Sequence, residues 1–170
     1  MFYELMFPKL NNLIKNRQST DMKKNISLLF LFIGLIVSAQ SIDYNTKKGY
    51  AANGYDVVSY FDNQALEGKT EFSTTFDGVN YKFSSQDNLD KFTSSPEKYA
   101  PQYGGYCAYA VAVSGKKVSI NPETYEIRDD KLYLFYNKGK TNTLELWKNE
   151  SPNALQAKAD VNWEKIKNKK

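Results

Sequence analysis

The one cysteine of this 170-residue chain lies in its most distinctive segment. Residues 103–110 read Tyr-Gly-Gly-Tyr-Cys-Ala-Tyr-Ala, which places the thiol of Cys107 among two glycines and three tyrosines. The chain has no histidine, and its methionines stand at positions 1, 6 and 22. Because zinc and Cu(I) prefer thiolate or imidazole ligands, Cys107 is the one side chain beyond residue 22 that suits either metal.

Three roles are open to this thiol. A free cysteine is among the most buried residue types, and small neighbours such as Ala108 and Ala110 suit a packing role. Alternatively, Cys107 and Asp56 form the floor of a cleft that binds an unknown small ligand or a protein partner. The tyrosines that we expect to line this cleft are Tyr55, Tyr60, Tyr103, Tyr106 and Tyr109.

The third role is redox or nucleophilic chemistry. A reactive cysteine needs a base or a cation that lowers its pKa, and only Lys98 or a helix beginning near Gly105 could supply one to Cys107. Metal capture is a special case of ligand binding, in which a Cu ion would need Cys107 with Asp56, a tyrosinate or the cysteine of a second molecule. No catalytic residue is predicted, because hydrolase triads and most metallohydrolase sites depend on histidine.

Residues 22–39 have the pattern of a secretory signal peptide. A basic start at Lys23 and Lys24 precedes an apolar run over residues 26–37, and small residues then suit cleavage before Gln40. The run is short for a membrane span, which needs ~20 apolar residues. We therefore expect an exported protein, periplasmic or extracellular, linked to the membrane only through its cleaved signal peptide. Residues 1–21 do not fit a signal peptide, and we expect translation to begin at Met22.

The charge of the chain gives no reason to expect a nucleic-acid partner. Of its 23 basic and 19 acidic residues, five and two lie in residues 1–39, which leaves 18 basic and 17 acidic residues. Nucleic-acid binding needs clustered Lys and Arg. The basic tail at residues 167–170 suits a solvated helix end.

Two antiparallel hairpins are predicted. Apolar residues alternate with polar ones on both sides of Asp77-Gly78, a dipeptide that favours a type I′ turn. A two-residue loop there pairs Phe76 with Val79, Thr74 with Tyr81 and Phe72 with Phe83. The second hairpin spans residues 125–136 and turns at Asp129-Asp130, with Ile127 facing Leu132 and Tyr125 facing Leu134.

Helices are predicted between and after the hairpins. A short central helix begins with Ser84 as its N-cap and ends before Pro96. Leu144 and Trp147 mark a second helix, and Ser151-Pro152 begins a third. The apolar stripe of that C-terminal amphipathic helix, expected to pack on the sheet, consists of Leu155, Ala159, Trp163 and Ile166. The order hairpin, helix, hairpin, helix predicts one small α+β domain.

Three segments of the chain resemble YHS-domain proteins. They are residues 54–61 (Gly-Tyr-Asp-Val-Val-Ser-Tyr-Phe), residues 81–85 (Tyr-Lys-Phe-Ser-Ser) and residues 95–110, and the similarity extends over about residues 49–166. The Gly-Gly-Tyr-Cys-Ala-Tyr-Ala segment is similar to the secreted, single-domain branch of the family, whose members mostly have no assigned activity.

The resemblance implies a metal site in some relatives, but this chain lacks most of the cysteines that would form it. YHS modules attached to copper-transporting ATPases and hydroxylases carry cysteines that are suspected metal ligands. At the corresponding positions this chain has Ser59, Ser84 and Asn88. Serine and asparagine are poor ligands for zinc or Cu(I), so the resemblance leaves Cys107 as the one candidate ligand of that kind.

Overall fold

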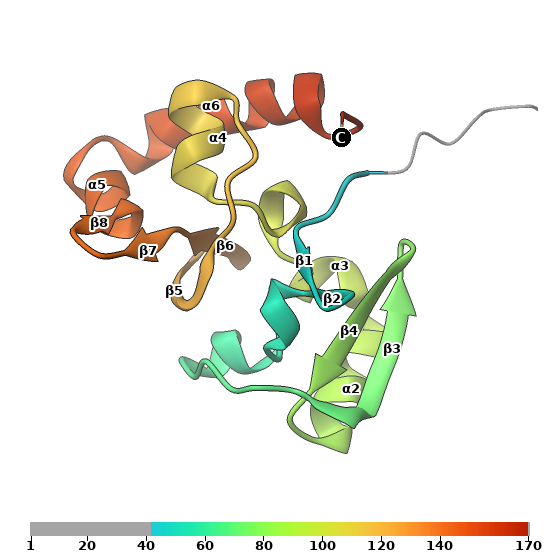
Figure 1. The fold of residues 1–170 in the computed structure, drawn as a ribbon. Coiled ribbons are helices and arrows are strands. Elements are labelled where there is room, and N and C mark those ends of the chain that lie inside the picture. Colours follow the sequence, from blue (N-terminus) through green and yellow to red (C-terminus); the bar gives the residue numbers. More distant parts are fainter. Residues whose placement is uncertain (1–41, 170) are drawn as a thin grey trace, which may run out of the picture. The chain divides into compact units, whose positions relative to one another are not determined.

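The computed structural model describes residues 42–169, in which consecutive pairs of strands are followed by groups of helices (Figure 1). This arrangement confirms the predicted α+β class. The predicted signal peptide and the predicted start at Met22 lie outside the described residues. No helix within residues 42–169 is long and apolar enough to cross a membrane.

The strands are β1 (Thr46–Lys47), β2 (Tyr50–Ala51), β3 (Lys69–Phe76), β4 (Val79–Phe83), β5 (Asn121–Arg128), β6 (Lys131–Phe135), β7 (Asn137–Lys138) and β8 (Thr141–Asn142). The α-helices are α2 (Gln86–Ser94), α3 (Pro96–Tyr99), α4 (Ala108–Ser114), α5 (Thr143–Asn149) and α6 (Pro152–Ile166). Three 3-10 turns connect them: η1 (Ala52–Gly54), η2 (Ser59–Asp62) and η3 (Gln102–Gly105).

The first predicted hairpin is formed by β3 and β4, which belong to a sheet with strand order β1-β2-β4-β3. Its turn has positive φ at both central residues, 49° at Asp77 and 75° at Gly78, as a type I′ turn requires. Two of the predicted pairs are confirmed: Phe76 with Val79 and Thr74 with Tyr81. The predicted pair of Phe72 with Phe83 is wrong, because the register shifts between Lys69 and Ser73 and Phe83 lies opposite Lys69.

The second predicted hairpin is formed by β5 and β6. Its predicted pairs are both confirmed: Ile127 with Leu132 and Tyr125 with Leu134. Asp129 and Asp130 both adopt positive φ, so the turn lies where the sequence places it. Residues 132–135 on β6 are all buried, and the strand contributes Leu132 and Leu134 to one hydrophobic cluster and Tyr133 and Phe135 to the other.

Helix α2 lies against the β3–β4 hairpin (Figure 1), and its cap differs from the prediction by one residue. Ser85, not Ser84, is the N-cap, because its side chain accepts a hydrogen bond from the backbone N–H of Asn88. Ser84 instead turns its hydroxyl toward Asp56. Phe92 lies on the inner face of the helix and packs against three other rings, those of Phe76, Tyr81 and Phe83.

The predicted helices α5 and α6 form, and α6 packs differently from the prediction. Leu155 and Ala159 are buried on α6 as predicted, but the helix lies across α4 (Figure 1), not on a sheet. The unpredicted α4 supplies Val111 and Ala112 to this contact, where Asn162 donates to both of their carbonyl groups. These helices enclose Trp147, Tyr133 and Phe135 in a second hydrophobic cluster.

Candidate functional site

Cys107 lies fully buried in the core. The chain reaches it through three consecutive residues with positive φ, Tyr103, Gly104 and Gly105, which turn the backbone inward before α4 begins. The backbone N–H of Cys107 donates to the carbonyl of Val118 (2.9 Å), and its Sγ lies 3.3 Å from Oγ1 of Thr143. Its side chain is 0% exposed, which fits the packing role among the three that the sequence leaves open.

Asp56 is also 0% exposed, and five hydrogen bonds surround its carboxylate. Oδ1 accepts from the backbone N–H groups of Val58 (2.9 Å) and Ser59 (3.3 Å). Oδ2 accepts from the backbone N–H of Ser84 (2.8 Å), the hydroxyl of Ser84 (2.6 Å) and the side-chain amide of Asn88 (2.7 Å). Such saturation compensates the burial of a charge, so Asp56 ties the loop at residues 56–59 to the start of α2.

The donors around Asp56 include the residues that replace the cysteines of related modules. Ser59 contributes its backbone N–H, whereas Ser84 and Asn88 point side-chain donors at the same carboxylate oxygen. Groups that donate hydrogen bonds to an anion do not form a thiolate or imidazole ligand set. No cluster of three or more His, Cys, Asp or Glu that could hold a metal occurs within residues 42–169. The side chains present therefore do not fit the copper site suspected in relatives.

The predicted tyrosines do not line one common cleft, although Tyr55, Tyr60 and Tyr109 belong to or pack against the hydrophobic cluster that contains Cys107. Tyr60 is fully buried, donates to the carbonyl of Pro122 (2.7 Å) and has a pKa raised by that burial. Tyr55 lines a polar hollow on another side, and Tyr109 donates to the exposed Glu150. The structure thus does not gather these tyrosines around Cys107 and Asp56 as the accessible floor of one cleft.

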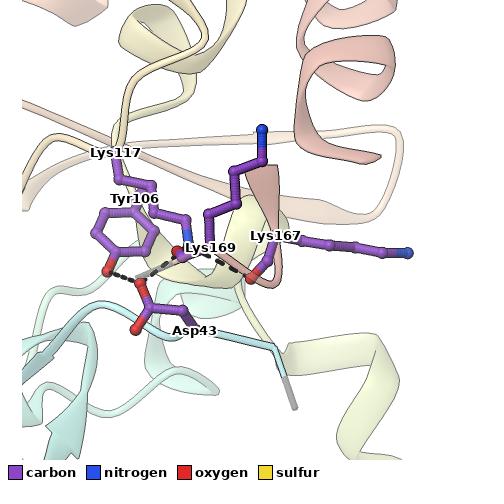
Figure 2. Close-up of polar contacts among 5 residues, drawn as sticks. All are labelled: Asp43, Tyr106, Lys117, Lys167 and Lys169. Carbon is purple, nitrogen blue, oxygen red and sulfur yellow. Dashed lines mark hydrogen bonds and ion pairs between the residues drawn. The ribbon is translucent and has the colours of Figure 1, made fainter. Parts of the chain in front are cut away.

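Tyr106 belongs to a polar cluster that joins the two ends of the described chain. Figure 2 shows its hydroxyl donating to Asp43 (2.9 Å), which also forms an ion pair with Lys117 (2.9 Å). The Lys117 ammonium donates as well to the backbone carbonyls of Lys167 and Lys169. Burial, and then the hydrogen bond to Asp43, raises the pKa of Tyr106 to about 12.

Tyr103 lies at an open cleft of about 510 Å³ between the N-terminal segment, the β3–β4 turn, α3 and α6. Aromatic rings supply much of its apolar surface: Tyr44, Phe76, Tyr103 and Trp163. Carboxylates supply its charge: Asp77, Glu97, Asp160 and Glu164. The remaining lining residues are uncharged, so the cleft contains no Lys or Arg.

Two tyrosine hydroxyls orient carboxylates of this cleft. Tyr103 donates to Oδ1 of Asp160 (2.9 Å), and Tyr44 donates to Oδ2 of Asp77 (2.5 Å). Burial is the first cause of the raised pKa of both tyrosines, followed by these hydrogen bonds. Gly104 permits the close approach of Trp163, whose ring would lie 2.9 Å from a Cβ at that position. The cleft is therefore built on fixed aromatic side chains with oriented acids at its margin.

These features define a small α+β domain with a buried thiol and an aromatic, acidic cleft. A family model described as the YHS domain matches residues 57–103, so the chain is similar to YHS domains over that segment. The match includes Ser59, Ser84 and Asn88 and ends at Tyr103, before Cys107. Neither the curated proteins nor the solved structures contain a match to the chain.

The sequence predicts Tyr103 as a site residue but none of the other residues that line the cleft. It predicts Asp77 in a turn and Trp163 on the apolar face of a helix. No sequence signal joins these residues, since 86 positions separate Asp77 from Trp163.

Proposed function

We propose that this protein is exported to the periplasm or the cell exterior and acts there as a non-enzymatic module that binds a small ligand in the aromatic, acidic cleft. The observation that carries the proposal is the cleft itself, a concave surface of about 510 Å³ with apolar walls and a few converging polar groups. This combination is typical of small-molecule sites. Export rests on the signal-peptide pattern of residues 22–39 and on the resemblance to the secreted branch of YHS proteins.

The geometry around Cys107 favours this role over copper handling or thiol redox chemistry. Its thiol is buried, and the polar group in contact with it is the neutral hydroxyl of Thr143. A reactive thiol is normally partly exposed and lies near a cation. The cleft is open, by contrast, and Tyr103 is the member of the predicted tyrosine set that borders it.

The test is a ligand-observed NMR screen of a fragment library against the full chain and two variants. Ala100→Trp places an indole in the cleft, because Ala100 lines it. Ala154→Trp is the matched control, since Ala154 is exposed on α6 and does not line the cleft. We expect fragments that bind the wild type and Ala154→Trp but not Ala100→Trp. The proposal fails if no fragment binds, or if all fragments that bind are retained by Ala100→Trp.

A further inference from the structure

The charge of the cleft indicates the kind of ligand it selects. Four carboxylates line it, and of these four only Glu164 forms an ion pair within residues 42–169, with the partly exposed Lys167 (2.7 Å). Asp77, Glu97 and Asp160 have no cationic partner within that range. An excess of unpaired carboxylates gives the cleft a negative potential, which attracts cations and repels anions.

The aromatic walls add a second preference for cations. The face of an aromatic ring carries partial negative charge and attracts an ammonium group within about 6 Å. This protein already holds one ammonium in that way beside the cleft. Lys117 lies 5.6 Å from the ring centroid of Trp163 and 5.5 Å from that of Tyr106, with the carboxylate of Asp43 at 2.9 Å. Trp163 also lines the cleft. An ammonium ion bound there would lie near the same ring, and the carboxylates of the cleft would compensate its charge as Asp43 does for Lys117.

From these observations we infer that the ligand of the cleft is a small organic ammonium ion. The positive group lies among the aromatic faces of Trp163, Tyr103 and Tyr44, and Asp160 and Asp77 compensate its charge. The cationic centre confers selectivity, because a neutral molecule of the same shape keeps the apolar contacts but loses the interactions with the rings and carboxylates. This inference rests on the proposed function and specifies the class of its ligand.

Three probes of nearly the same shape test the inference: choline, its neutral analogue 3,3-dimethylbutan-1-ol and the anion 3,3-dimethylbutanoate. Each is titrated into the full chain at neutral pH and followed by calorimetry and tryptophan fluorescence. We expect choline to bind at least about tenfold more tightly than the neutral alcohol, as cation–π and carboxylate contacts together imply. The anion should not bind measurably.

Matched variants locate the binding. Asp160→Asn keeps the oxygen that accepts from Tyr103 but removes the charge, and it should weaken choline binding about twofold to fivefold without changing binding of the alcohol. Glu145→Gln removes an exposed acid on α5 outside the cleft and should change neither. Equal binding of choline and the alcohol overturns the cationic class while supporting the small-ligand function. Failure of all three probes to bind also overturns the class, and the screen with Ala100→Trp then decides the function separately.

Discussion

Removal of the Asp56 carboxylate is expected to destabilise the domain strongly. Asp56→Ala leaves five hydrogen bonds without their acceptor in a site that is 0% exposed. Two of the five donors lose less than the others. The backbone N–H of Ser59 also donates to the Asp56 carbonyl, and Asn88 is partly exposed, so water can accept from its amide. The backbone N–H groups of Val58 and Ser84 lose their charged acceptor. Each of these two N–H groups left without an acceptor is unfavourable by about 1–3 kcal/mol, so we expect Asp56→Ala to lower the free energy of unfolding by about 2–6 kcal/mol.

The assay is urea unfolding followed by tryptophan fluorescence and circular dichroism. Asp62→Ala, an exposed acid in η2, is the control and should change the free energy of unfolding by no more than about 0.5 kcal/mol. Asp56→Asn should be nearly as destabilised as Asp56→Ala, because its amide nitrogen must face at least two of the five donors. A loss below about 1 kcal/mol in Asp56→Ala would refute the assignment of Asp56 as the structural centre of this loop.

Three further predictions follow from the core and from the cluster joining the chain ends. The Cys107 thiol should react with a disulfide reagent at least about a hundredfold more slowly in the native protein than in urea, and similar rates would show that the thiol is accessible. The free energy of unfolding should fall as the pH rises from 10 to about 12, because tyrosine in the unfolded chain ionises near pH 10 whereas Tyr106 in the folded protein keeps its proton to about 12. Tyr106→Phe should therefore reduce the dependence of the urea midpoint on pH over that range. An unchanged profile in Tyr106→Phe would contradict this. Lys117→Met should lower the unfolding free energy by about 1–3 kcal/mol in urea titrations, since it removes the ion pair with Asp43. The control Lys116→Met, at an exposed lysine, should change the unfolding free energy by no more than about 0.5 kcal/mol, and equal effects of the two variants would count against the cluster.

The sequence predicts the hairpins well because their turns and alternation agree. Asp77-Gly78 specifies a type I′ turn, and the pairs next to it form as expected. The error lies at the far end of the same hairpin, where a bulge places Lys69 rather than Phe72 opposite Phe83. A bulge inserts a residue without disturbing the composition of the strand, so alternation alone does not reveal it.

Helix packing was predicted less completely than helix formation. The stripe that includes Leu155 and Ala159 predicts which face of α6 is buried but not that α4 covers it. Helix α4 was missed because residues 108–114 are few and contain two valines, which have no strong helix preference. The packing partner of an amphipathic face is a property of the tertiary structure.

Some of the site residues could be predicted from the sequence, whereas others are brought together only by the tertiary structure. The resemblance drew attention to Ser84 and Asn88, and the structure shows that they bind the Asp56 carboxylate. The burial of Cys107 was one of the alternatives that the sequence left open, and local composition did not decide between them. The acids of the cleft come from a turn and from two helices, α3 and α6, so only the folded chain brings Asp77 and Asp160 to one cleft.

The most direct test of a ligand site at the cleft is a titration of the protein with a fragment found in the screen. Two-dimensional ¹H–¹⁵N NMR spectra follow the indole N–H signals of the tryptophans during the titration. The chain has two tryptophans, of which Trp163 lines the cleft while Trp147 is fully buried and donates to Glu126. A ligand site at the cleft predicts that the Trp163 indole signal moves with saturating dependence on fragment concentration while the Trp147 signal stays fixed. A fragment that binds without moving the Trp163 signal would contradict it.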